Sequence, residues 1–188
     1  MNTFKNNLTL LILSLALLSG TVSAAVPQWV QPGTSATYHM ISGGWANGAP
    51  VENNAAEAYV TNQADEVTAE GTTGTASIYN PLTGQTNVQQ VTCTDGGPAC
   101  VGRFWLDPNN PAGSFLDETG VTYTVLNEMA YSAAGKNWDA TTMAYQNPGS
   151  GVTYSVIYDT KSGLVLAYSH EYPPEKIYMT LQSTNAEI

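Results

Sequence analysis

The sequence predicts an all-β protein, with a single-domain antiparallel meander that forms a curved sheet, a half-barrel or a sandwich. Three observations predict this class. Asn, Thr, Ser, Gly, Tyr and Val dominate the chain, a composition typical of strands and turns. Apolar residues recur at a period of two, and long helical patterns are missing. Gly, Pro, Asn or Asp separates almost every pair of alternating segments.

The first 24 residues have the three parts of a secretory signal peptide. Lys5 supplies a cation, an apolar run covers 8–18, and small residues occupy 22–24. A membrane-spanning helix needs about 20 apolar residues, so this run is too short to be one. We therefore expect 1–24 to be cleaved. The mature chain should be soluble, without a membrane span, in the periplasm or outside the cell.

The rest of the chain is predicted to be an extended N-terminal segment over 25–33 and one antiparallel β domain over 34–188. The full chain carries five Lys and Arg against fifteen Asp and Glu, for a net charge of −10 at pH 7. Such an acidic surface repels phosphate backbones and anionic headgroups. This argues against nucleic-acid binding and against attachment to a membrane by charge.

Strand patterns follow one another along the whole domain, and we expect at most one short helical turn. The clearest local structure is the hairpin of 152–159 and 163–171, whose apolar side chains fall on both faces and so indicate a central pair of strands. In its turn, Asp159 can accept backbone N–H groups and Gly163 can adopt a positive φ angle. The predicted strands are 34–41, 55–62, 65–71, 75–80, 86–93, 100–107, 121–129, 138–146, 152–159, 163–171 and 176–183.

The two cysteines, Cys93 and Cys100, enclose the turn TDGGPA. In an oxidising compartment they predict a small disulfide loop that contributes about 2–2.5 kcal/mol. A metal site would need further Cys or His nearby, and a redox pair would need the CxxC spacing.

The segments Gly135–Ala140 (GKNWDA) and Tyr158–Leu164 (YDTKSGL) resemble the closing strands of exported bacterial β proteins of the LolA/LppX-like half-barrel type. The resemblance covers about 100–183. It implies a strongly curved antiparallel sheet around an apolar cavity that takes an acyl chain or another amphiphile.

Aromatic residues are the best candidates for binding. They can line an apolar cavity, form a stacking platform for carbohydrate, or fill the core. Trp45 stands between glycines and Asn, where it is either an exposed contact residue or a plug folded onto the sheet. The predicted ligand-binding residues are Trp45, Trp105, Trp138, Tyr154 and Tyr158.

The sequence offers little for catalysis. His39 and His170 are the only histidines, without metal-ligand spacing, and no GxSxG motif occurs. We therefore expect no enzyme and no cofactor. Carboxylates at 65–66, 107 and 117–118 lie in polar segments that are compatible with a structural calcium ion or with simple solvation.

Two functions remain open. The first is an exported, non-catalytic β domain that binds an amphiphilic or apolar ligand in the concave face of its sheet. The second is an extracellular structural or adhesive subunit that assembles through strand addition, with 25–33 completing the sheet of a neighbour.

Overall fold

The computed structural model describes residues 25–46, 49–50, 56–94, 102–114, 123–146, 151–172 and 175–188. The predicted signal peptide over 1–24 lies outside these residues and stays a prediction. Within the described part, no helix combines the length and apolar character needed to span a membrane.

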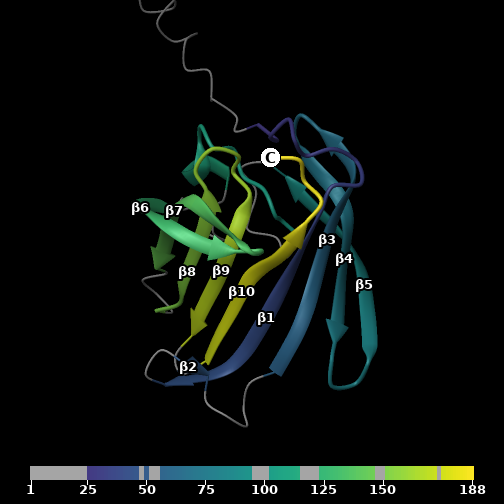
Figure 1. The fold of residues 1–188 in the computed structure, drawn as a ribbon, viewed down its shortest axis with the longest axis vertical. Coiled ribbons are helices and arrows are strands. Elements are labelled where there is room, and N and C mark those ends of the chain that lie inside the picture. Colours follow the sequence, from purple (N-terminus) through teal and green to yellow (C-terminus); the bar gives the residue numbers. More distant parts are fainter. Residues whose placement is uncertain are drawn as a thin grey trace, which may run out of the picture.

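One antiparallel sheet that does not close on itself makes up the fold, as Figure 1 shows. Its strand order is β5-β4-β3-β1-β10-β9-β8-β7-β6, with β2 paired to β1 outside this path. The predicted all-β class is therefore confirmed. The strands are β1 (Ser35–Ala46), β2 (Ala49–Pro50), β3 (Ala56–Thr68), β4 (Gly71–Asn80), β5 (Gln85–Thr94), β6 (Thr124–Ala133), β7 (Lys136–Gln146), β8 (Thr153–Asp159), β9 (Val165–Tyr172) and β10 (Glu175–Thr184), and a short 3₁₀ helix, η1, covers Pro111–Ser114.

Most neighbouring strands in the sheet are also neighbours in the sequence, as in a meander. The exception is β1, which lies between β3 and β10. The pair β1–β10 joins residues far apart in the chain, for example Met40 to Met179. This pairing places the two halves of the meander in one continuous sheet.

Two predicted strands, 55–62 and 65–71, form one long strand instead. β3 runs through Ala56–Thr68, and its register against β4 shifts between Ala64 and Glu66. Asp65 is the extra residue of this bulge. A bulge lets a strand bend and continue, so the polar residues that looked like a turn do not end it.

The prediction of a strand over 100–107 is wrong for its described part. Within the described part of the chain, residues 102–107 form β pairing only as an isolated bridge between Trp105 and Leu164. The N–H of Leu106 donates to the carbonyl of Gly163 (2.9 Å), and the N–H of Val165 donates to that of Phe104 (3.0 Å). This segment lies over one face of the sheet, where the side chains of Phe104, Trp105 and Leu106 are buried. Their apolar character therefore reflects packing against the sheet and not membership of a strand.

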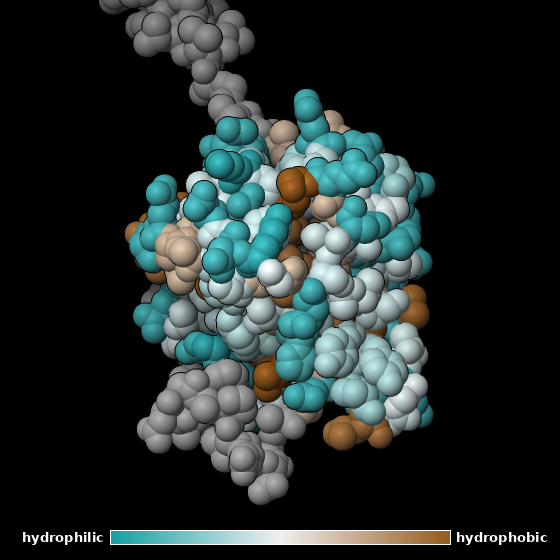
Figure 2. Space-filling view, in the orientation of Figure 1, coloured by the Kyte–Doolittle hydropathy of each residue, from teal (hydrophilic) through white to brown (hydrophobic). Residues whose placement is uncertain are grey.

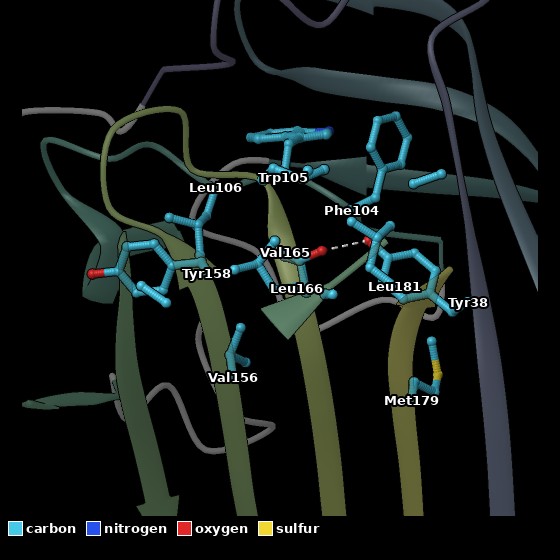
Figure 3. Packing of buried hydrophobic residues seen from close by; sticks show 14 of the residues in the cluster. Tyr38, Phe104, Trp105, Leu106, Val156, Tyr158, Val165, Leu166, Met179 and Leu181 are labelled. Atoms are coloured by element: carbon cyan, nitrogen blue, oxygen red, sulfur yellow. Dashed lines mark hydrogen bonds between the residues drawn. The ribbon is translucent and has the colours of Figure 1, made fainter. Parts of the chain in front are cut away.

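The sheet curves toward the face that this segment covers. Trp105 pairs with Leu164, just before β9, and its indole N–H donates to the hydroxyl of Thr72 in β4 (3.2 Å). Three strands separate β4 from β9 in the sheet, so one side chain reaches both only because the sheet bends. We call this side the concave face. Figure 3 shows Phe104, Trp105 and Leu106 packed above Leu166 and Leu181.

The opposite, convex face is partly covered by the β6–β7 hairpin, which lies across β8–β10 in Figure 1. The hydroxyl groups of Tyr131 and Tyr178 are 2.8 Å apart, and the N–H of Ala134 donates to the carbonyl of Leu181 (3.2 Å). The space-filling view from this side is mostly hydrophilic, with scattered hydrophobic residues (Figure 2).

Candidate functional site

The upper part of the concave face is filled by the chain itself. Trp105 and Leu106 are fully buried, and Phe104 is 1% exposed. The Arg103 guanidinium lies 4.8 Å from the centre of the Trp105 ring and also donates to the carbonyl of Thr94 at the end of β5. These contacts join the segment to both halves of the sheet. A ligand on the concave face therefore has to lie elsewhere on it.

The turn between β8 and β9 positions this segment. The Asp159 carboxylate accepts the N–H and the hydroxyl of Ser162 (2.8 and 2.6 Å). Gly163 has a φ of 75°, and a side chain there would meet the carbonyl oxygen of Leu106 at 2.1 Å. A residue without Cβ thus allows the segment to approach the turn closely. Asp159 and Gly163 are the two residues that the sequence predicts for this turn.

The predicted ligand-binding residues do not form one group. Trp105 belongs to the filled part of the concave face. Trp138 is a buried residue of β7, and its indole N–H donates to the carbonyl of Ala133 in the neighbouring β6 (3.0 Å). Tyr158 is also buried, and this burial raises the pKa of its hydroxyl; the hydrogen bond with Thr141 opposes the shift, and the charge of Glu128 adds to it. The backbone of Trp45 pairs with Pro50. The side chain of Trp45 lies outside the described part of the structure. Of the other four residues, Tyr154 alone lies in the half-buried part described next.

Below the filled part, an apolar row crosses five strands of the concave face. Its members are directly opposite one another in the register of β7, β8, β9, β10 and β1. Three are methionines, whose flexible thioether side chains adapt to irregular apolar partners. We call it the methionine row, and its residues are Met143, Val156, Tyr168, Met179 and Met40.

A second row lies beside it on the same face, two residues further along each strand. Its members are Tyr145, Tyr154, His170, Ile177 and Ser42. We call it the aromatic row, because three of its rings stack. The ring centres of Tyr145 and Tyr154 are 6.3 Å apart, and those of Tyr154 and His170 are 4.5 Å apart. Tyr123 lies beside this stack, with its ring centre 6.2 Å from that of Tyr145 and the two ring planes tilted by 55°.

The two rows differ in what they can bind. The methionine row has only apolar groups and one tyrosine. Its members Met40 and Tyr168 are partly exposed, whereas Met143, Val156 and Met179 are buried beneath the surface. The aromatic row has apolar rings with polar ends, the tyrosine hydroxyls and the histidine nitrogens. Its members are half-buried, except Ile177, which is exposed. An apolar strip with a polar border is complementary to a molecule that has both an apolar and a polar part.

Burial raises the pKa of Tyr168 to about 12, with a smaller contribution from Tyr154. A raised folded-state pKa gives stability that is present below the ordinary value of 10.0 and is lost as the pH rises through the folded value. We therefore expect the unfolding free energy to fall between pH 10 and 12, and Tyr168→Phe to lessen this slope by up to about 1.4 kcal/mol per pH unit. Urea titrations at several pH values measure it. Equal slopes for both proteins would contradict the assignment.

The sequence interpretation missed the methionines, Tyr168 and His170. Their alternation with polar neighbours was visible, since Met40, Tyr168, His170 and Met179 all stand at strand positions of period two. The missing information was the pairing of β1 with β10, which brings Met40 and Met179 opposite each other.

The two histidines lie on opposite faces of the sheet. His170 belongs to the concave aromatic row, whereas His39 is on the convex face, 3.5 Å from a carboxylate oxygen of Glu57 and stacked on Tyr59. They cannot act on one substrate together.

Among the described residues, no three His, Cys, Asp or Glu side chains come together as metal ligands. Asp107 accepts the backbone N–H of Ala25 (3.0 Å) and of Asn109 (2.8 Å), so its carboxylate holds two loop segments in place. The acidic pair 117–118 lies outside the described residues.

Cys93 is buried in β5, and Cys100 lies outside the described residues, so the disulfide stays a prediction. The segment 25–33 packs on its own domain. Its Val30 is buried, and the indole N–H of Trp29 donates to the carbonyl of Ser162 (2.6 Å).

Comparison with known proteins gives a coarse likeness only. No family model and no curated protein matches the chain. One similar solved structure is a hypothetical protein from Chlamydia trachomatis, with 6% identity over 88% of this chain and 94% of that one, at a TM-score of 0.42. Another is a "putative outer membrane lipoprotein-sorting protein domain" from Vibrio parahaemolyticus, with 10% identity over 85% and 86%, at a TM-score of 0.30. At these values neither assigns a ligand or an activity to this chain.

Proposed function

We propose that this chain is an exported, non-catalytic β domain that binds a single-chain amphiphile on the concave face of its sheet. The observation that carries the proposal is the pair of adjacent rows. The apolar chain of the ligand lies against Met40 and Tyr168, the partly exposed members of the methionine row, and its headgroup lies at the aromatic row. The signal-peptide pattern of 1–24 supports export, and the acidic composition of the chain is compatible with an exported protein.

The charge of the protein selects the headgroup. The chain carries a net charge of −10, so an anionic headgroup is repelled. The polar groups of the aromatic row are hydroxyls and an imidazole, which donate and accept hydrogen bonds without requiring a charged partner. A zwitterionic or neutral headgroup therefore fits best.

The binding surface is small and partly exposed, which limits affinity. Each methylene that leaves water contributes about 0.8 kcal/mol before the cost of ordering the ligand. A chain of moderate length can thus reach micromolar affinity without a closed cavity.

Met40→Gln tests the apolar row. Titration calorimetry with lysophosphatidylcholine below its micelle concentration should show binding to the unchanged protein. The variant places an amide where the acyl chain lies, and the loss of about 1.5 kcal/mol corresponds to roughly tenfold weaker binding. Dodecanoate, which has an anionic headgroup, should bind less tightly at low salt, and added salt should narrow the difference.

Ile41→Gln is the matched control. Ile41 is the next residue of β1, is also half-buried, and points to the convex face. It should leave lysophosphatidylcholine binding within a factor of two of the unchanged protein. Absence of binding by the unchanged protein, or equal losses in both variants, would refute the proposal.

A further inference from the structure

One edge of the sheet lacks the features that usually prevent strands from pairing with other molecules. β5 is an edge strand of ten residues, QTNVQQVTCT, and it borders the sheet on the right in Figure 1. It contains no charged residue, no proline and no glycine. Its pairing with β4 is regular from Gly71–Thr94 to Asn80–Gln85, without a bulge. Charges, prolines and bulges are the usual protection of an edge.

The strand is also accessible. The side chains from Gln85 to Gln90 are exposed, including Val88 at 57%. Among the described residues, the contacts to this strand from outside the sheet are at its far end, where Arg103 binds the carbonyl of Thr94 and Gly102 lies against the side chain of Val91. Alternate residues of an edge strand direct their N–H and C=O groups away from the sheet. The free edge therefore offers a row of backbone donors and acceptors.

The other edge of the sheet is protected. β6 has a register shift between Val125 and Asn127, and it carries the exposed carboxylate of Glu128. Its end is also held against β10 by the hydrogen bond between Tyr131 and Tyr178. The contrast makes β5 the edge that is open for strand addition.

We propose that β5 pairs antiparallel with β5 of a second copy of this chain. The distribution of charge favours a second copy as the partner of this edge. No residue from Gly71 to Thr94 is charged, whereas the whole chain has a net charge of −10. Two copies meet with the least repulsion at this hairpin. The polar side chains of β5 are mostly Gln, Asn and Thr, which hydrogen-bond well to their own kind in adjacent strands.

Symmetry fixes the arrangement. Two neighbouring antiparallel strands of identical molecules are related by a twofold axis normal to the sheet, so each contact occurs twice. This axis keeps both concave faces on the same side of the joined sheet. An axis through Gln89 places Gln89 opposite itself, with Val88 opposite Gln90 of the second copy. The paired stretch then ends before the part that Arg103 covers.

The dimer should be weak and should respond to salt in a particular direction. A single strand pair should bury less surface than about 1,200 Å², the lower limit for a standard stable interface, so we expect the dimer to dissociate at low concentration. Because the two copies are both acidic and the interface is uncharged, added salt screens repulsion and strengthens the dimer. An interface built on ion pairs would weaken.

The test is light scattering on the purified full chain over a range of concentrations, at low and at moderate salt. The unchanged protein should shift from monomer to dimer as concentration and salt rise. Gln89→Lys should raise the dissociation constant at least tenfold, because two like charges then face each other. Gln89→Glu should do the same. An equal mixture of the two variants should recover the dimer, as opposite charges then meet.

Leu126→Lys, on the exposed part of β6, is the matched control and should leave the dimer unchanged. A monomer at every concentration and salt overturns the proposal, as does a dimer that is lost only in Leu126→Lys. Circular dichroism of each variant verifies the fold. This proposal does not depend on amphiphile binding, since β5 is not part of either row.

Discussion

Replacement of Trp105 by alanine is expected to lower the free energy of unfolding by about 3–5 kcal/mol. The side chain is fully buried and connects two distant parts of the sheet. Its loss leaves a large cavity between β9 and β4, and it leaves the Thr72 hydroxyl without the indole N–H that it accepts. The Arg103 guanidinium also loses the ring beneath it.

Urea denaturation, followed by circular dichroism, measures this change. Leu82→Ala serves as the control, because Leu82 lies in the turn after β4 and is 84% exposed; it should change stability by less than about 0.5 kcal/mol. Trp105→Phe should fall between the two, since it keeps much of the apolar volume. A loss below about 1 kcal/mol for Trp105→Ala would mean that 102–107 is not part of the cooperative core.

Gly163→Ala should destabilise the protein by more than about 2 kcal/mol. Two effects add at this position. A left-handed backbone costs a residue with a Cβ about 1–2 kcal/mol. The new methyl group would also meet the backbone carbonyl of Leu106 at 2.1 Å and the Pro108 ring at 3.2 Å. Backbone cannot rotate away as a side chain can, so the segment over the concave face has to move.

Gly135→Ala isolates the second effect. Gly135, in the β6–β7 turn, has the same φ of 75°, but an added Cβ there meets nothing within 4 Å. The free energy of unfolding of Gly135→Ala should fall only by the conformational cost of about 1–2 kcal/mol. If the two glycine variants lose the same stability by thermal and urea unfolding, the close approach of Leu106 to Gly163 does not contribute.

Local chemistry was predictable from the sequence where neighbouring residues determine it. In the β8–β9 hairpin, Asp159 and Gly163 have the conformations that their residue types favour, and both faces of β9 are covered as the apolar pattern indicated. The segment 100–107 shows the limit. Apolar β-branched and aromatic residues are favoured in a strand and in an extended segment pressed on a sheet alike, and only tertiary packing distinguishes the two.

The candidate site could be predicted only in part for a related reason. Alternation tells which residues of one strand share a face, and so it included Tyr154 among the binding residues. It does not tell which strands are neighbours. The methionine row exists because β1 lies beside β10, which places Met40 opposite Met179. These residues are far apart in the chain, so no local sequence pattern predicts their pairing.

The place of β1 between β3 and β10 also bears on how the molecule folds. Hairpins such as β8–β9 can form early, since their residues are close in the chain. The centre of the sheet cannot, because closing the loop between Ser35–Ala46 and Glu175–Thr184 costs chain entropy before any contact repays it. We expect slow, late consolidation of the middle strands, so the completed sheet forms well after its individual hairpins.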